Sequence, residues 1–374
     1  MLYYAEASSE EVDGGIQITG SHNPPNYNGF KMVHAHAPFF GADIQTIGAL
    51  AAAGDWEAGV GTVRDHDIFD QYVTRLTEGF TGGAFRIGWD AGNGAAGPAL
   101  ELLVRKLPGE HHLLFTQVDG TFPNHEANPL EPANLVDLQK AVAAHRADLG
   151  LAFDGDADRC FVVDERGEAV TPSAVAAIVA AREISRAQAI DPGAEIVVIH
   201  NLITSNIVPE TIRALGATPV RTKVGHSLIK DQMAATGAVF GGEHSAHYYF
   251  KNFWGADNGM LAAMHVLAEF GSQSEPLSTL TAKYSPYALS GEINSTVSDV
   301  TAATARVRSA FEDRGTIDGL DGLTITGSVA EGEAFWWFSV RPSNTEPLLR
   351  LNVEAADEST MARVRDEVLA LIRA

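Results

Sequence analysis

Short apolar runs alternate with longer helical stretches along most of the chain. Gly, Asn or Asp residues bound the apolar runs, and Ala- and Leu-rich segments with helical spacing follow them. This alternation is typical of strands that feed helices, and it predicts an α/β fold with largely parallel or mixed sheets. We predict strands at four such runs, each followed by a polar loop and a helical segment: Gly15–Thr19, Phe85–Trp89, Leu149–Phe153 and Glu195–Ile199.

Turn residues interrupt this pattern at Thr81–Gly83 and near Pro172, and the pattern itself changes towards the C-terminus. There, strands over Ala334–Arg341 and Pro347–Ala355 and a helix over Glu358–Arg373 predict a smaller α+β domain. The absence of any short fixed repeat disfavours solenoids and propellers. We therefore predict four domains, the first three of them α/β: residues 1–80, 81–170, 171–288 and 289–374.

Composition and charge narrow the range of possible functions. The 374 residues carry 26 Lys and Arg against 48 Asp and Glu, so the formal net charge is −22. We therefore do not expect a positively charged surface that binds nucleic acid or an anionic membrane. We predict that the protein acts on small molecules. The single cysteine, Cys160, excludes a disulfide framework and a zinc site built on several thiolates. No apolar run reaches the roughly 18 residues of a spanning helix, and we expect a cytoplasmic protein.

Three carboxylates form the strongest candidate metal site. Asp154, Asp156 and Asp158 follow the predicted strand Leu149–Phe153, which places them at the carboxyl end of a strand, where open α/β sheets bind ligands. Like charges this close repel one another unless a cation lies among them, and oxygen ligands suit a hard ion such as Mg²⁺. An EF-hand is excluded because Arg159 replaces its glycine. A solvated acidic turn is the structural alternative.

A serine loop follows the first predicted strand. Ser21 and His22 lie on a turn rich in Asn and Pro, and Lys31 comes soon after it. A serine in this setting is a candidate nucleophile or phosphate carrier, although Ser, Asn and Pro are also ordinary turn formers. His226 and Lys230 add positive charge further along the chain, but a helix face that carries such residues is usually solvated.

Two later loops suit a phosphorylated sugar. Gly241–His247 places a carboxylate, a hydroxyl and two imidazoles on one loop, a set that suits neighbouring sugar hydroxyls. Arg341–Pro347 joins two predicted strands and presents one guanidinium with short polar side chains. Such a loop suits a phosphate, because Arg binds phosphate oxygens in a bidentate manner. An ordinary polar loop is the alternative in both cases.

A glycine-rich segment supports a different hypothesis. Gly92–Gly97 matches G-x-G-x-x-G after the predicted strand Phe85–Trp89, and Asp119 lies near the distance expected of a ribose-binding acid. A dinucleotide-dependent oxidoreductase is therefore an alternative function. We favour a tight strand-to-helix turn, because dinucleotide binding leaves the three carboxylates and the Arg341 loop without a role.

Taken together and in this order, the segments TGSHNPPNYNGFK, DGDADR, GGEHSAH and RPSNTEP resemble the four signature loops of the α-D-phosphohexomutase superfamily. The likeness is closest to the bacterial phosphomannomutase/phosphoglucomutase branch, and it covers nearly the whole chain. The resemblance implies consecutive domains around a central cleft and the reversible interconversion of hexose 1-phosphate and hexose 6-phosphate, with mannose and also glucose as the sugar. It further implies Mg²⁺, a phosphoserine and a hexose 1,6-bisphosphate that is both intermediate and activator.

The resemblance also assigns roles to individual residues. The implied metal ligands are the phosphorylated Ser21 together with Asp154, Asp156 and Asp158. The implied catalytic residues are Ser21, His22, Lys31, Arg159 and His226. The residues implied to bind substrate are Glu243, Ser245 and His247 for the sugar, and Arg341, Ser343, Asn344 and Thr345 for the phosphate that is not transferred.

One feature departs from the family pattern. Members begin with a complete first domain, whose opening glycine-rich segment carries an arginine that contacts the active site, whereas Met1 lies shortly before Ser21 here. We therefore expect an incomplete first domain, with exposed strand edges and apolar surface that impair stability and activity. A non-catalytic binder of sugar phosphates is the second hypothesis.

Overall fold

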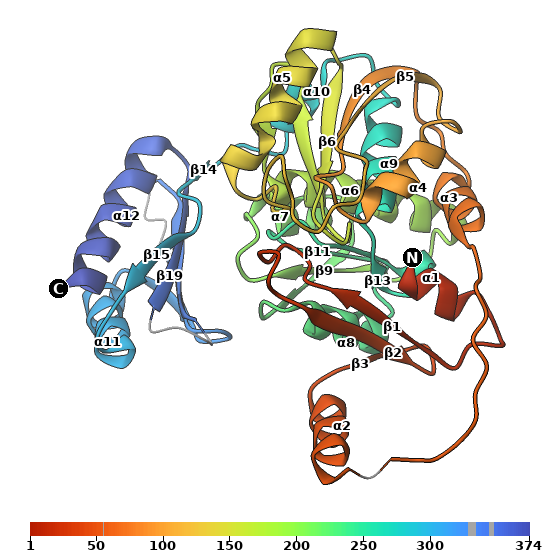
Figure 1. Ribbon diagram of the computed structural model, residues 1–374. Coiled ribbons are helices and arrows are strands. Elements are labelled where there is room, and N and C mark those ends of the chain that lie inside the picture. The colour runs from red at the N-terminus through yellow and green to blue at the C-terminus, as the bar shows by residue number, and fades with distance from the viewer. Residues whose placement is uncertain (55, 328–333, 344–347) are drawn as a thin grey trace.

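The computed structural model describes residues 1–54, 56–327, 334–343 and 348–374, and it contains four β-sheets in succession along the chain (Figure 1). The first three sheets lie together with their helices, and the C-terminal sheet lies to one side of them. This arrangement confirms the predicted succession of α/β units with mixed sheets and a smaller C-terminal unit. Among the residues described, we find no helix with the length and apolar character needed to cross a lipid bilayer.

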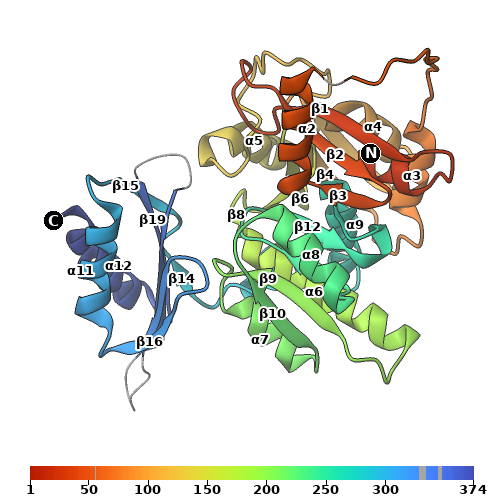
Figure 2. The same cartoon turned by 90° about the horizontal axis from the view of Figure 1, so that it is seen from below.

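The N-terminal unit is a small antiparallel sheet. Its elements are α1 (Leu2–Ala7), β1 (Gly14–Thr19), β2 (Gly29–His34), β3 (Ala37–Phe39) and α2 (Ala42–Ala53). Ile18 of β1 lies opposite Phe30 of β2, and these two side chains are 66% and 64% exposed. The helix α2, all of which is described, buries none of its residues. It lies below the sheet in Figure 1 and overlaps β1 in the view from below in Figure 2.

The second unit is a mixed sheet in the order β5-β4-β6-β7-β8. Its first three strands are parallel, and β7 and β8 continue it in antiparallel pairing. Every residue of β6 and β7 is buried. The elements are α3 (Phe69–Thr77), β4 (Phe85–Asp90), α4 (Ala96–Leu103), β5 (Gly109–Leu114), a 3-10 helix (Pro132–Leu135), α5 (Val136–His145), β6 (Leu149–Phe153), β7 (Cys160–Asp164) and β8 (Ala169–Val170).

The third unit is another mixed sheet, in the order β10-β9-β11-β12-β13. One hydrophobic core runs through the second and third units and includes Trp89, Val175 and Phe250. The elements are α6 (Pro172–Ile190), β9 (Val197–Asn201), α7 (Ile207–Ala214), β10 (Thr218–Thr222), α8 (His226–Thr236), β11 (Phe240–Gly242), β12 (Tyr248–Phe250), a 3-10 helix (Lys251–Phe253), β13 (Ala256–Asp257), α9 (Gly259–Phe270) and α10 (Leu277–Ala282).

The C-terminal unit is an antiparallel sheet with its own core around Phe311, Ile325 and Phe338. The backbone N–H of Asn206 donates to Glu354 Oε1 (2.9 Å) and so joins this unit to the third one. The elements are β14 (Ala288–Leu289), β15 (Ile293–Thr296), α11 (Val300–Phe311), β16 (Gly315–Asp318), β17 (Leu323–Gly327), β18 (Trp336–Pro342), β19 (Leu348–Ala355) and α12 (Glu358–Arg373).

Several long helices begin where the sequence provides a side-chain cap. The side chain that precedes the helix accepts a hydrogen bond from a backbone N–H of the first turn, which would otherwise lack a partner. Such caps begin α6, α9, α11 and α12, with Thr171, Asn258, Asp299 and Asp357 as the capping residues.

Two of the four predicted strands are followed by a different element from the one we expected. After both Gly15–Thr19 and Leu149–Phe153 the chain forms a loop and an antiparallel strand, and not a helix. Loop length is the physical reason, because a crossover to a parallel strand needs about a dozen residues or more and these loops are shorter. The strand predicted at Glu195–Ile199 begins slightly later, as Val197–Asn201.

Candidate active site

The serine loop connects β1 to β2 and holds Ser21 in an uncommon backbone conformation. Ser21 has a φ of 52°, in the left-handed region that few residues other than glycine adopt. Its backbone N–H donates to Thr19 Oγ1 (2.8 Å), and the Thr19 hydroxyl donates to Asp156 Oδ2 (2.9 Å). One threonine therefore ties the serine loop to the loop that carries the three aspartates.

The Ser21 hydroxyl lies between a carboxylate and an imidazole. It donates to Asp154 Oδ2 over 3.3 Å, and its oxygen lies 3.2 Å from Nδ1 of the exposed His22. The structure thus brings two predicted catalytic residues and one predicted metal ligand to the same point.

The metal loop, Asp154–Arg159, joins β6 to β7 and gathers its three carboxylates. One oxygen from each of Asp154, Asp156 and Asp158 lies within 4.8 Å of the other two. Asp154 is fully buried and accepts hydrogen bonds from the backbone N–H (3.2 Å) and Nε (2.8 Å) of Arg159. Burial raises the pKa of Asp154 above its usual range.

The free carboxylate oxygens of this loop fit a hard cation. Oδ1 of Asp156 is buried and has no hydrogen-bond partner among the residues described, and the buried Oδ1 of Asp158 has only the His247 imidazole near it, at 3.4 Å. Buried carboxylate oxygens that lack donors are costly unless an ion coordinates them, and oxygen-only donor sets suit hard divalent cations. The acidic cluster therefore has the composition of a metal site.

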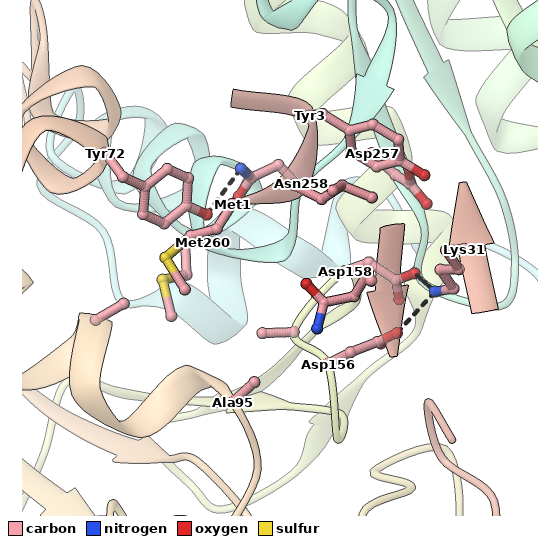
Figure 3. A pocket seen from close by; sticks show the side chains of 14 residues that line it. Met1, Tyr3, Lys31, Tyr72, Ala95, Asp156, Asp158, Asp257, Asn258 and Met260 are labelled. Carbon is pink, nitrogen blue, oxygen red and sulfur yellow. Dashed lines mark hydrogen bonds and ion pairs between the residues drawn. The ribbon is translucent and has the colours of Figure 1, made fainter. Parts of the chain in front are cut away.

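Lys31 partly balances the charge of the metal loop from the serine side. Its Nζ lies 2.8 Å from Asp156 Oδ2 and also pairs with Asp158 Oδ2. Figure 3 shows the ammonium group pointing at both carboxylates, beside a cavity of about 110 Å³ that these residues line. Burial by itself lowers the pKa of Lys31, but the charges of Asp158 and Asp156 raise that pKa above its ordinary value, so the group is cationic.

The sugar loop, Gly241–His247, runs from the end of β11 towards β12 and packs directly against the metal loop. A backbone bridge pairs His247 with Arg159, and His247 Nε2 lies 3.4 Å from Asp158 Oδ1. Burial lowers the pKa of His247, but the adjacent Asp158 carboxylate outweighs it and raises that pKa to about 9. The imidazole is therefore protonated at neutral pH and can donate a proton.

Inside the sugar loop the predicted substrate residues form a hydrogen-bonded chain. The Ser245 hydroxyl donates to Glu243 Oε2 (3.0 Å), and its oxygen lies 3.0 Å from His247 Nδ1. The Tyr249 hydroxyl donates to Glu243 Oε1 (2.9 Å), and Asn201 contacts Glu243 as well. The Glu243 carboxylate is thus fixed in one orientation before any sugar binds.

The remaining predicted residues lie on the C-terminal unit, apart from His226 on the third unit. Arg341, on β18, is 8% exposed, and its guanidinium lies 3.6 Å from Asp321 Oδ2 and 3.7 Å from Glu292 Oε2. The backbone N–H of Ser343 donates to the carbonyl oxygen of Leu348 (2.9 Å). Asn344 and Thr345 lie outside the described residues. The backbone of His226 begins α8, and its side chain is also outside the described part.

The site contains a buried ion pair that sequence reasoning missed. Lys230, expected on a solvated helix face, is 8% exposed, with Nζ 2.8 Å from Asp257 Oδ1 and donating to the Tyr3 hydroxyl (2.7 Å). The expectation was wrong because Asp257 provides the counter-charge that makes burial of a lysine tolerable. An oxygen of Asp257 also lies within 4.8 Å of ligand atoms of Asp158 and His247. In sequence, Asp257 looks like part of the ordinary start of α9.

The glycine-rich segment forms the predicted turn between β4 and α4. The contacts of this turn within the protein account for it without a bound dinucleotide. The backbone N–H of Ala95 donates to the carbonyl oxygen of Gly155 (2.8 Å), so the turn contacts the metal loop directly. The Asp119 carboxylate accepts hydrogen bonds from the backbone N–H and hydroxyl of Thr121. Both observations disfavour the dinucleotide hypothesis.

Each of the four successive sheets carries one of these polar loops, and that organisation is the one that defines the α-D-phosphohexomutases. In chain order, residues 1–58, 70–167, 172–287 and 292–371 match domains I, II and III and the C-terminal domain of phosphoglucomutase/phosphomannomutase.

Individual relatives agree with these domain matches. A phosphomannomutase of Salmonella typhimurium is 37% identical over 376 residues, which cover 96% of this chain and 79% of the relative. A phosphomannomutase/phosphoglucomutase of Pseudomonas aeruginosa is 36% identical over 370 residues, which cover 98% of this chain and 77% of the relative. The X-ray structure of a phosphoglucomutase/phosphomannomutase family protein from Burkholderia thailandensis aligns with a TM-score of 0.85 at 32% identity, over 97% of this chain and 76% of that one.

The chain belongs to the phosphoglucomutase/phosphomannomutase family. Family membership confirms the phosphohexomutase hypothesis and, with it, an enzyme of the isomerase class that moves a phosphoryl group within a sugar phosphate. It supports neither the oxidoreductase nor the non-catalytic binder.

Proposed function

We propose that this chain interconverts hexose 1-phosphate and hexose 6-phosphate, with mannose and glucose as the sugars, through phosphorylated Ser21 and a hexose 1,6-bisphosphate. The observation that carries the proposal is the position of Ser21. Its hydroxyl contacts Asp154, while Lys31 pairs with the other two aspartates of the metal loop. Phosphoryl transfer depends mainly on positioning and on neutralised charge, and these residues provide both.

In the first transfer, the free hydroxyl of the bound sugar phosphate attacks the phosphorus on Ser21. The bond between phosphorus and Ser21 Oγ breaks and Ser21 Oγ takes up a proton, while the attacking hydroxyl gives its proton to a base in the site. His22 is one candidate base, because its Nδ1 lies 3.2 Å from Ser21 Oγ. The products are a hexose 1,6-bisphosphate and unmodified Ser21.

In the second transfer, the bisphosphate has turned around and Ser21 Oγ attacks its other phosphorus, while the Ser21 hydroxyl gives its proton to a base in the site. The bond between that phosphorus and the sugar oxygen breaks, and the oxygen takes up a proton. His247 is suited to supply a proton in this region, because its pKa of about 9 keeps it protonated at neutral pH. Ser21 is rephosphorylated, and the sugar leaves with its phosphate at the other position.

The substrate is held at its two ends. Glu243 and Ser245 receive the sugar hydroxyls, and Arg341 and Ser343, with Asn344 and Thr345 of the same loop, bind the phosphate that stays in place. His226 is proposed as a further contact. Arg159, buried against Asp154, keeps the metal loop in shape. Each of the proposed domains, residues 1–80, 81–170, 171–288 and 289–374, contributes one loop.

Asp154, Asp156, Asp158 and phosphorylated Ser21 would hold Mg²⁺. When bound, this ion neutralises charge on the phosphoryl group in transit. The hexose 1,6-bisphosphate also serves as activator, because it phosphorylates unmodified Ser21. We also place the enzyme in the cytoplasm. The sequence has one cysteine, the buried Cys160, and so cannot form an internal disulfide, which suits a reducing compartment.

The test compares wild type, Ser21→Ala and the control Ser272→Ala, whose hydroxyl lies on an exposed turn. Turnover of mannose 1-phosphate and glucose 1-phosphate is followed in a coupled assay with Mg²⁺ and a trace of bisphosphate, and phosphorylation by intact mass. We expect Ser21→Ala to lose both turnover and the phosphate mass, while Ser272→Ala keeps both. Undiminished turnover in Ser21→Ala overturns the proposal.

A further inference from the structure

The glycine-rich turn Gly92–Gly97 has no part in the chemistry above, yet its backbone supports the metal loop. Beyond the hydrogen bond from Ala95 to Gly155, Gly94 lies so close to this loop that a side chain would not fit. A Cβ on Gly94 would lie 2.6 Å from the carbonyl oxygen of Gly155 and 2.9 Å from its Cα. Both atoms are backbone, so no side-chain rotation can relieve the overlap.

Gly155 makes an equally close approach on its other side, to the serine loop. A Cβ on Gly155 would overlap the carbonyl oxygen of Ser21 and lie 3.2 Å from its carbonyl carbon. Three backbone segments are therefore stacked: the glycine-rich turn, the metal loop and the serine loop. Neither Gly94 nor Gly155 has a positive φ, so close approach, and not an unusual backbone conformation, is what requires glycine at both positions.

The turn is itself firmly anchored in the second sheet. Asn93, with a φ of 58°, donates from Nδ2 to the carbonyl oxygen of Gln117 (2.9 Å) and accepts from Asn124 Nδ2 (2.8 Å). The backbone N–H of Gly92 donates to Asp90 Oδ1 (2.8 Å), whose carboxylate is buried. A displaced metal loop therefore cannot be accommodated by an easy movement of the turn.

We propose that Gly94 and Gly155 are positioning residues, which set the separation between the metal-binding carboxylates and Ser21. The proposal rests on the function proposed above. A misplacement of about 1 Å can cost a factor of about 100 in rate when reacting groups must be aligned. Groups that orient metal ligands from behind typically affect metal affinity by about 10- to 100-fold.

The test uses Gly94→Ala with Gly97→Ala as its matched control. Gly97 belongs to the same turn, and a Cβ there would overlap the carbonyl oxygen of Thr116 and lie 2.6 Å from its carbonyl carbon. This backbone clash is more severe than the one at Gly94, but Thr116 is not part of the metal loop. Both substitutions introduce a backbone clash, and only that at Gly94 presses on the metal loop. The measurements on the full chain are Mn²⁺ affinity by electron paramagnetic resonance, thermal stability, and kcat and KM for mannose 1-phosphate.

We expect Gly94→Ala to weaken Mn²⁺ binding by about 10-fold and to lower kcat by about 10- to 100-fold, with KM nearly unchanged. Gly97→Ala is expected to lower thermal stability while its folded fraction binds Mn²⁺ like wild type. Equal losses of Mn²⁺ affinity in the two variants, or wild-type Mn²⁺ binding in Gly94→Ala, overturn the proposal, as does a wild-type chain that binds no Mn²⁺.

Two further arms keep the result decisive. If Gly94→Ala does not fold, Asn93→Gly loosens the turn without a clash, and a Mn²⁺ affinity equal to that of wild type in this variant overturns the proposal. If wild type binds Mn²⁺ but does not interconvert sugar phosphates, the proposed function fails, and the comparison of Mn²⁺ affinities still tests the role of Gly94.

Discussion

The serine loop and the metal loop meet at one site, but the sheets that carry them are packed differently. The strands β6 and β7, on either side of the metal loop, are buried along their whole length. On β1 and β2, by contrast, Ile16, Ile18 and Phe30 are 65%, 66% and 64% exposed. A continuous hydrophobic core thus holds the metal loop, while the outer face of the serine hairpin contributes little burial.

Hydrogen bonds and ion pairs instead hold the serine hairpin, formed by β1, β2 and the loop between them, in place. Lys31 pairs with Asp156 and Asp158, and Thr19 also donates to Asp156. These bonds end on the carboxylates that are the candidate metal ligands. The second sheet is therefore fixed by its hydrophobic core, and the charged carboxylates of the metal loop hold Ser21 in position against that sheet. A change of charge at the metal loop is expected to move the serine loop as well.

The largest effect should follow from removing the cation that joins the two loops. In Lys31→Met, the carboxylates of Asp156 and Asp158 lose their partner, and the transferring phosphoryl group loses a stabilising charge. We expect kcat to fall by about 100- to 1,000-fold and hydrogen exchange to rise in residues 14–34. The exposed Lys251 provides the control as Lys251→Met. Retention of more than a tenth of the wild-type kcat contradicts this coupling.

The difference in packing predicts the next largest effect. Leu151→Ala removes a fully buried side chain from β6 and should lower the free energy of unfolding by about 3 kcal/mol. Ile18→Thr changes a side chain that is 66% exposed on the serine hairpin, and it should cost less than about 0.5 kcal/mol. Urea unfolding of both variants measures the difference. Equal costs show that the outer face of the hairpin is packed after all.

The same contrast explains what the sequence could predict. The polar loops were predictable because each follows an apolar run, and the ends of buried strands are where ligand-binding residues gather. The exposure of the hairpin was not, because Ile16 and Ile18 alternate with polar residues and glycine in the same way on a covered face and on a bare one. The buried pair of Lys230 and Asp257 is equally invisible, since its members are far apart in sequence and each has an ordinary local context.

Acid should act on the packed region before it acts on the Lys31 contacts of the hairpin. His265, on α9, is buried with its ring stacked on Phe250, and burial, aided by the charges of Arg186 and Arg182, lowers its pKa to about 3. Below its ordinary pKa of 6.5 the unfolded chain binds a proton that the folded chain refuses, so stability falls as the pH falls. Between pH 7 and pH 5 the loss from this group is about 2 kcal/mol.

The variant His265→Phe keeps an aromatic ring beside Phe250 and removes the titrating group. Its melting temperature should therefore fall less than that of wild type between pH 7 and pH 5. The adjacent Glu183 acts in the opposite direction, because burial raises its pKa and the neutral form favours folding at low pH.

The Lys31 contacts should persist over this range, since the charges of His247 and Lys31 outweigh burial and hold the pKa of Asp158 well below its usual range. If the melting temperature falls with pH equally steeply in wild type and His265→Phe, the acid sensitivity does not arise from His265. If hydrogen exchange at pH 5 rises only in residues 14–34, the acid sensitivity lies in the serine hairpin.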